Sequence, residues 1–223
     1  MSHPDHALWR AGWRANRIDF HQHEVNPSLL RFWPELALAA NDRVFVPLCG
    51  KSLDLLWLYR QGHSVTGVEL SPVAVRAFFR ESRLQPKRAS RGALVHWAYE
   101  RMEIFCGDFF QLCASDLVGV KAVYDRASLT ALPEELRASY VAHLRAILPA
   151  DCVIFLLTVE DLDDEESESA AIEASEEIQL LYADGFEIEL RHAECFPAVL
   201  PTGDIVAEPR SVHKVYLIRR GQP

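Results

Sequence analysis

The sequence lacks a hydrophobic run long enough to cross a membrane, because its longest apolar stretches, such as residues 152–159, have the length of a strand. It also lacks an excess of positive charge, since 23 lysines and arginines stand against 32 aspartates and glutamates, a formal net charge of −9. Nucleic-acid partners favour a basic face, so we expect none. The N-terminus lacks the charged and then apolar layout of a signal peptide, and the expected location is therefore the cytoplasm.

Paired cysteines and clustered metal ligands are also missing. The five cysteines are Cys49, Cys106, Cys113, Cys152 and Cys195, and no two of them form a C-x-x-C pair. An odd, scattered set is typical of reduced thiols. His21 and His23 lie beside Glu24, but two histidines without further spaced ligands are weak evidence for a metal, and we expect no metal. Cys49 is open to two interpretations, a nucleophile or a small half-buried loop residue.

Glycine is scarce in the loop near residue 50. Residues 43–46 have strand character and run into a tight Pro-Leu-Cys-Gly turn, after which a helical pattern begins. A dinucleotide-binding loop would read G-x-G-x-x-G there, and this loop has only Gly50. A phosphate-binding G-x-x-x-x-G-K-S loop would need its first glycine at the position of Phe45. The loop therefore predicts a ligand without a phosphate.

The next strand, expected over residues 64–69, ends in an acid. Glu69 occupies the strand tip where nucleotide-type α/β folds bind the two hydroxyls of a ribose. A ribose-binding acid without a phosphate cradle favours a nucleoside ligand, of which S-adenosylmethionine is the commonest. The alternative is that Glu69 is only a surface carboxylate at a strand end.

The alternation of strands and helices from residue 43 onward predicts an α/β fold. With 223 residues, 49% of them hydrophobic, the chain suits one domain, comprising an N-terminal cap at 1–40 and an α/β core at 41–223. Seven strands are expected, at 43–47, 64–69, 102–106, 122–124, 152–159, 186–191 and 213–219. Residues 84–93 are expected to form a basic loop. The sheet should be Rossmann-like and mostly parallel, with helices on both faces and the last two strands as an antiparallel edge. The carboxyl ends of its first four strands should meet at one site.

The aromatic residues of the N-terminal cap allow two interpretations. Trp9 and Trp13 have helical spacing, and Trp33 belongs to a second helical segment. Such an extension could be a lid over a ligand. Alternatively, the three tryptophans plug one end of the core.

The chain resembles the thiopurine S-methyltransferase family. The resemblance is carried by Trp13, Phe20-His21, the Val-Pro-Leu-Cys-Gly-Lys motif of residues 46–51, residues 62–69 with Ser71, and Tyr-Asp-Arg-Ala at 124–127. It extends over about residues 8–160 and more loosely to the end. It implies a seven-stranded methyltransferase that uses S-adenosylmethionine and forms S-adenosylhomocysteine, with a small-molecule thiol as acceptor and possible activity on selenium or tellurium species.

The resemblance also implies roles for single residues. Trp13 would cover the cofactor, Leu48 would contact it and Glu69 would bind its ribose. Asp108 and Phe109 would flank the adenine, Arg126 would meet the methionine carboxylate, and Phe20 would form part of the acceptor wall. No general base is assigned, because a thiol supplies some thiolate at neutral pH and catalysis reduces to positioning.

Two stretches depart from the family pattern, and both lie on the acceptor side. Residues 160–169 are strongly acidic where family members carry Gly-Pro-Pro-Phe, and residues 196–210 lack the expected tryptophan and glycine motif. A binding protein without catalysis and another nucleotide-dependent enzyme of the same fold remain as alternatives. Nothing in the sequence requires more than a monomer.

Overall fold

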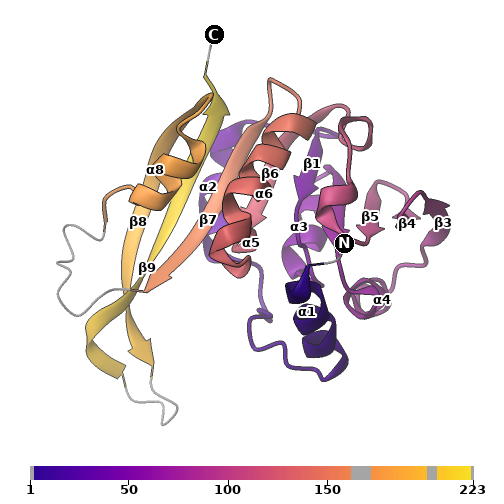
Figure 1. Cartoon of the computed structure of the whole chain (residues 1–223), viewed down its shortest axis with the longest axis horizontal. Helices are drawn as coiled ribbons and strands as arrows, with labels where there is room; N and C mark the ends of the chain where they lie inside the picture. Colours follow the sequence, from indigo (N-terminus) through magenta and orange to yellow (C-terminus); the bar gives the residue numbers. More distant parts are fainter. Residues whose placement is uncertain (1–2, 162–171, 200–204, 222–223) are drawn as a thin grey trace. The chain divides into compact units, whose positions relative to one another are not determined.

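The computed structural model describes residues 3–161, 172–199 and 205–221 (Figure 1). The chain forms two compact units. The first contains Met1–Tyr124 and His143–Pro149, and the second contains Asp125–Ala142 and Ala150–Pro223. The expected single domain over 1–223 stays a prediction.

The first unit is built on a sheet whose strand order is β3-β4-β5-β2-β1-β6. The strands are β1 (Arg43–Val46), β2 (Ser64–Glu69), β3 (Lys87–Arg91), β4 (Leu94–Tyr99), β5 (Met102–Cys106) and β6 (Val120–Arg126), the last two residues of which belong to the second unit. β1 pairs in parallel with β2 and β6, and β2 pairs in parallel with β5. This parallel core confirms the expected α/β class.

The β3–β4 hairpin is a strand pair that the sequence analysis missed. Residues 84–93 were expected to be a loop, but Lys87–Arg91 forms β3, which pairs antiparallel with β4, and β4 pairs antiparallel with β5. All five residues of β3 are exposed, so the strand has no apolar alternation that would reveal it. The other seven strands overlap the seven expected ones, although β6, β8 and β9 are longer than expected.

Two helices follow the central strands and are specified by local sequence. α3 (Leu53–Arg60) is capped by Ser52, whose hydroxyl accepts from the Asp54 N–H, and α4 (Pro72–Glu81) by Ser71, with proline in its first turn. α4 buries Phe78 and Phe79, and the Phe79 ring stacks on Trp97 at 6.0 Å. Each buried aromatic side chain contributes about 1.5–3 kcal/mol, so packing fixes this helix more firmly than its cap does.

The N-terminal segment forms α1 (Pro4–Arg14), α2 (Pro27–Phe32) and the 3₁₀ helix η1 (Trp33–Leu36), which confirms the helical spacing there. Trp33 is 4% exposed, and its Nε1 donates to His63 Nε2 at 3.2 Å. Trp33 thus belongs to the core. Trp9 and Trp13 instead contact Phe20.

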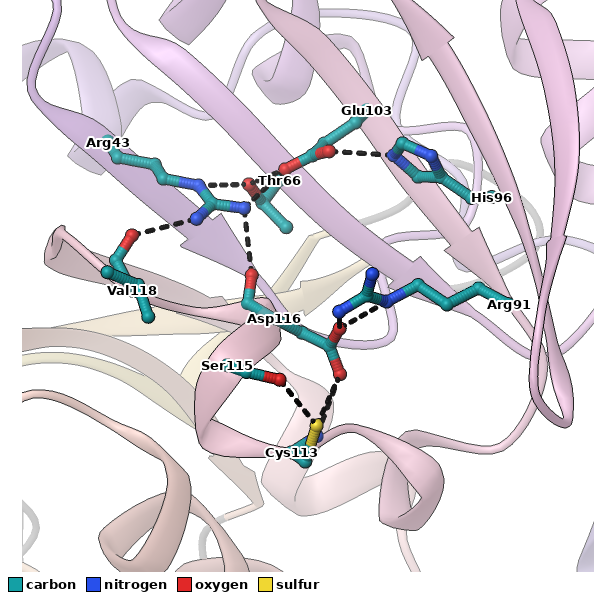
Figure 2. Close-up of polar contacts among 9 residues, drawn as sticks. All are labelled: Arg43, Thr66, Arg91, His96, Glu103, Cys113, Ser115, Asp116 and Val118. Carbon is teal, nitrogen blue, oxygen red and sulfur yellow. Dashed lines mark hydrogen bonds and ion pairs between the residues drawn. The ribbon is translucent and has the colours of Figure 1, made fainter.

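A polar cluster centred on Arg43 ties five strands, β1 to β5, to the segment between β5 and β6 (Figure 2). The Arg43 guanidinium donates to Thr66 Oγ1 at 2.9 Å, to the carbonyl oxygens of Asp116 and Val118 at 2.8 Å each, and to Glu103. Further members of the cluster are His96, which is 2.7 Å from Glu103, and Arg91, which pairs with Asp116. Because one planar group serves several acceptors, the cluster fixes where this segment meets β1.

The second unit contains the strands β7 (Val153–Asp161), β8 (Phe186–Val199) and β9 (Ile205–Arg220) in the order β7-β9-β8, paired antiparallel. This confirms the antiparallel edge. Its helices are α5 (Ser128–Ala131), α8 (Glu176–Tyr182) and part of α6 (Glu134–Ile147). In the acidic stretch 160–169, Glu160 and Asp161 end β7, and residues 162–169 lie outside the described residues. In the stretch 196–210, residues 200–204 lie outside them as well. Among the helices of the described part, none is long and apolar enough to span a membrane.

Candidate functional site

The site begins with the loop that follows β1. Leu48 and Gly50 both have positive φ, +42° and +55°, and the Cys49 N–H donates to the Val68 carbonyl at 2.9 Å. A leucine in the left-handed region costs roughly 1–2 kcal/mol, so the surrounding contacts hold the loop in a strained shape. The loop is thereby pressed against the end of β2.

Glu69, the last residue of β2, lies at the centre of the site. Its side chain accepts two backbone hydrogen bonds, from the Gly50 N–H at 2.9 Å and from the Ser71 N–H at 2.6 Å. The residue is only 6% exposed. Burial raises the pKa of Glu69 to about 7, while the backbone N–H groups work in the opposite direction. Glu69 is therefore a buried carboxylate held by the loops around it, and the surface-carboxylate alternative is wrong.

A carboxylate offers about four acceptor positions, more than the N–H groups of Gly50 and Ser71 use, so Glu69 keeps capacity for further donors. Two hydroxyl donors on neighbouring carbons match this remaining capacity. Because the backbone groups fix the orientation of the carboxylate before any ligand arrives, the site is preorganised for such a pair.

Trp13 packs over the β1 loop from the N-terminal helix α1. A Cβ atom added at Gly50 would lie 3.3 Å from Trp13 Cζ2, so glycine is needed for the positive φ and for this close approach. The Trp13 side chain is 7% exposed. α1 thus contacts the loop that Glu69 holds.

Phe20 lies next to Trp13 but is largely open to solvent. Its ring meets Trp9 at 5.5 Å and Trp13 at 5.7 Å, both edge-on, and the residue is 50% exposed. A large exposed aromatic residue beside a buried tryptophan offers an apolar surface to a flat ligand.

Asp108 and Phe109 follow β5 and are anchored to Glu69 through their neighbour. The Gly107 N–H donates to the Glu69 carbonyl at 2.9 Å. The Asp108 side chain accepts from the Phe110 N–H at 3.0 Å and lies 3.9 Å from His6 Nε2 of α1. Phe109 is 3% exposed, and its ring packs edge-on against the His143 ring, with 5.0 Å between the ring centroids. A ligand at this edge of the sheet would therefore meet the Phe109 backbone more than its ring.

The structure therefore brings together the predicted residues Trp13, Phe20, Leu48, Glu69 and Asp108 with Phe109 in the first unit. Arg126 is the last residue of β6 and belongs to the second unit, so its contribution stays a prediction. The sequence reasoning missed the N–H groups of Gly50 and Ser71 and the side chain of His6. Ser71 was identifiable only as a helix cap, and nothing in the sequence signals that its N–H serves Glu69.

Cys49 is a structural residue of the loop. Burial raises the pKa of the Cys49 thiol well above its ordinary value, and the charge of Glu69 acts in the same direction. A thiol that resists ionisation is a poor nucleophile, and Cys49 is 6% exposed, so the structure favours the interpretation as a small loop residue. Within residues 3–161, 172–199 and 205–221, no group of three or more histidine, cysteine or acidic side chains could hold a metal ion.

Comparison with known proteins matches this chain to one family over nearly its whole length. The thiopurine S-methyltransferase family model matches residues 4–221. A thiopurine S-methyltransferase of Stutzerimonas stutzeri is 50% identical over 224 residues, covering 100% of this chain and 94% of the relative. One from Pseudomonas fluorescens is 46% identical over 184 residues, covering 82% and 84%.

Solved structures share the fold at low sequence identity. An S-adenosylmethionine-dependent methyltransferase from Anabaena variabilis has a TM-score of 0.66 at 15% identity, covering 99% of this chain and 96% of its own. The Burkholderia thailandensis 1,6-didemethyltoxoflavin-N1-methyltransferase, solved with bound 1,6-didemethyltoxoflavin and S-adenosylhomocysteine, has a TM-score of 0.63 at 16% identity, covering 100% of this chain and 92% of its own. The chain belongs to the thiopurine S-methyltransferase family, and it is an S-adenosylmethionine-dependent S-methyltransferase.

Proposed function

We propose that this enzyme transfers the methyl group of S-adenosylmethionine to the sulfur of a small aromatic thiol of the thiopurine type. The observation that carries the cofactor assignment is the buried carboxylate of Glu69, oriented by the N–H groups of Gly50 and Ser71. The names of the relatives supply the thiopurine class of acceptor. We further propose that the chain acts as a single domain, as a monomer and in the cytoplasm.

The residues around Glu69 fit a nucleoside without phosphates. The β1 loop carries one glycine with positive φ, and Trp13 lies against it, so this loop leaves no row of bare N–H groups for a pyrophosphate. Glu69 would accept the ribose hydroxyls, and Leu48 and Trp13 would contact the cofactor from the loop and from α1. Asp108 and the Phe109 backbone would border the adenine.

Arg126 would bind the methionine carboxylate of the cofactor. A guanidinium donates two parallel hydrogen bonds to a carboxylate, which fixes the orientation as well as the position of that end of the ligand.

The bound cofactor supplies a methyl group on a sulfonium sulfur, and its leaving group is a neutral thioether that needs no proton. The protein then has to hold the acceptor sulfur in line with the methyl carbon, about 3–3.5 Å away, and to exclude water. Phe20 and Trp13 would provide the flat apolar wall that orients an aromatic thiol. An aromatic thiol is more acidic than the alkyl thiol reference of about 8.5, so no dedicated base is assigned.

The test is a transfer assay with methyl-labelled S-adenosylmethionine and a panel of acceptors. The panel contains a thiopurine, a thiophenol, an aliphatic thiol, selenite and tellurite, and Glu69→Ala is the control. Label should move to the aromatic thiols and be lost in the variant. Binding of S-adenosylhomocysteine without transfer to any acceptor would overturn the proposed acceptor class and leave the cofactor assignment intact.

A further inference from the structure

Asp54 is a buried carboxylate that the cofactor site does not use. It lies in the first turn of α3 and is 1% exposed. Its two oxygens accept from different parts of the first unit: Oδ1 from the Asn26 N–H at 2.9 Å, and Oδ2 from the Tyr124 hydroxyl at 2.8 Å. A buried charge is costly unless hydrogen bonds compensate it, so both partners are held firmly.

Asn26 ends the segment that carries Phe20. We call residues 15–25, between α1 and α2, the strap. At one end of the strap, Trp13 of α1 lies on Gly50. At the other end, the Asn26 N–H is bound to Asp54. Gly50 lies in the loop before α3 and Asp54 in the first turn of α3, so both ends of the strap are tied to one short segment, residues 50–54.

Much of the strap is open to solvent. Phe20, at its middle, is 50% exposed, and residues 14–17 are exposed as well. Loop ends that are fixed restrict the positions open to the residues between them, because closing a loop removes much of its conformational freedom. Releasing one end should therefore move Phe20 more than it moves Glu69, which is held by its own backbone bonds.

We propose that Asp54 is a positioning residue for the acceptor: by holding Asn26, it keeps the strap closed and Phe20 beside Trp13. This inference rests on the proposed function of Phe20 as part of the acceptor wall. Through its second oxygen, Asp54 also holds Tyr124 of β6, which connects the strap to the central sheet of the first unit. Asp54 acts through Asn26 and Phe20 and does not touch the reacting atoms.

The alternative is that Asp54 merely stabilises the start of α3. A carboxylate in the first turn of a helix is favourable on its own account, although Ser52 already provides the cap. This local role would not depend on whether Asn26 has an N–H group.

The chain offers a matched pair of variants at Asn26. Its φ is −59°, which proline can adopt, and its side chain caps α2 by accepting from the N–H groups of Ser28 and Leu29. Asn26→Ala removes the cap and keeps the N–H that donates to Asp54. Asn26→Pro removes both. Proline also restricts its own φ and the backbone of Val25, which opposes faster exchange, so faster exchange in Asn26→Pro than in Asn26→Ala reports the lost bond to Asp54.

Three measurements distinguish the outcomes: amide hydrogen exchange over the strap, the acceptor KM, and the dissociation constant of S-adenosylhomocysteine. Relative to Asn26→Ala, Asn26→Pro should speed exchange over residues 15–25 and raise the KM of a thiopurine acceptor by about tenfold, the scale for one hydrogen bond to a charged group. The cofactor product should bind within about twofold in both variants, since Glu69 keeps its backbone partners. Asp54→Asn, whose amide oxygen can still accept from Asn26, should lie between wild type and Asn26→Pro.

Equal exchange and equal KM in the two Asn26 variants would overturn the inference, as would parallel losses of acceptor and cofactor binding. If the wild type methylated no thiol, the proposed function would fail on its own. Quenching of tryptophan fluorescence by a thiopurine would then replace KM as the measure of acceptor binding. The same comparison of Asn26→Pro with Asn26→Ala would still decide the role of Asp54.

Discussion

Glu69 has a carboxylate that is oriented before ligand binding, so its removal should weaken the cofactor without disturbing much else. Glu69→Ala should reduce affinity for S-adenosylhomocysteine by roughly 1–3 kcal/mol, the range for lost hydrogen bonds to a charged group. Titration calorimetry measures this directly. Asp108→Ala, at the same edge of the sheet, is measured for comparison. An unchanged dissociation constant for Glu69→Ala would contradict the ribose assignment.

The pKa of Glu69 predicts a pH dependence of binding. Burial raises this pKa to about 7, so the carboxyl is largely protonated below pH 7 and loses acceptor capacity. If only the charged form binds, affinity should fall by about tenfold for each pH unit below 7 and level off above it. S-adenosylhomocysteine has no group that titrates between about pH 5.5 and 8, so the slope reports the protein.

Calorimetry on wild type and Glu69→Ala across this range checks the assignment. The variant should bind weakly and with a flat profile. Any slope that survives in the variant belongs to groups other than Glu69. A wild-type profile that is flat between pH 5.5 and 8 would show that Glu69 binds equally well in both forms.

Gly67 in β2 lies so close to Cys49 that it admits no side chain. A Cβ atom there would be 2.8 Å from Cys49 Sγ, and 3.4 Å from atoms of Leu55 and Ile104. Gly67→Ala should lower the free energy of unfolding by about 1–3 kcal/mol, as overpacking of a core does. Adding Cys49→Ala removes the nearest atom, so the double variant should regain part of this loss. Urea unfolding of the two single variants and the double variant measures the coupling, and strict additivity would contradict the proposed clash.

At the level of elements, the sequence predicts best where burial leaves a pattern. β2 (Ser64–Glu69) was predicted with its bounds, because buried parallel strands are continuous apolar runs ending at polar residues. Ser52 and Ser71 lie directly before α3 and α4 and cap them, a local feature that sequence can encode. β3 (Lys87–Arg91) was missed because its residues are all exposed, and its existence depends on pairing with β4.

The candidate site, like the strands, could be predicted from the sequence only where a residue belongs to a local pattern. Glu69 could be identified because the end of a strand is a local feature. The contact of Trp13 with Gly50, the strap and the bond of Asp54 to Asn26 join segments far apart in the chain, and no local pattern encodes them. Family resemblance supplied Trp13 and Phe20, while Asp54 gave no signal beyond a carboxylate in a helical turn.

The contacts of the Arg43 cluster predict that Arg43 contributes to the free energy of unfolding (Figure 2). Burial alone would raise the pKa of Glu103, but hydrogen bonds from Thr66, His96 and Arg43 outweigh it and lower that pKa. Arg43→Met should leave Glu103 less compensated and free the carbonyl oxygens of Asp116 and Val118. The free energy of unfolding should fall by about 1–3 kcal/mol.

Urea unfolding at pH 7 tests this prediction. Arg88→Met is the matched control, because Arg88 is exposed and its guanidinium lies over the Trp97 ring at 4.9 Å, a contact worth about 0.5–1 kcal/mol. Since the folded pKa of Glu103 is lowered, its contribution is present at neutral pH and is lost as the pH falls through that pKa. The difference between Arg43→Met and wild type should therefore shrink in acid, and a difference no larger than that of Arg88→Met would contradict the role of Arg43.

At the scale of the whole molecule, ligand binding should appear as a gain in thermal stability. A ligand at 100 times its dissociation constant adds about 2.7 kcal/mol to the folded state. For a chain of this size, that corresponds to a rise in Tm of about 5–10 °C. S-adenosylhomocysteine should produce such a shift and NAD none, because the β1 loop has one glycine where a pyrophosphate needs several. Glu69→Ala at the same ligand concentration should show a smaller shift. A shift with NAD would instead favour a nucleotide-dependent enzyme of the same fold, and equal shifts in wild type and Glu69→Ala would place the ligand away from the carboxyl end of β2.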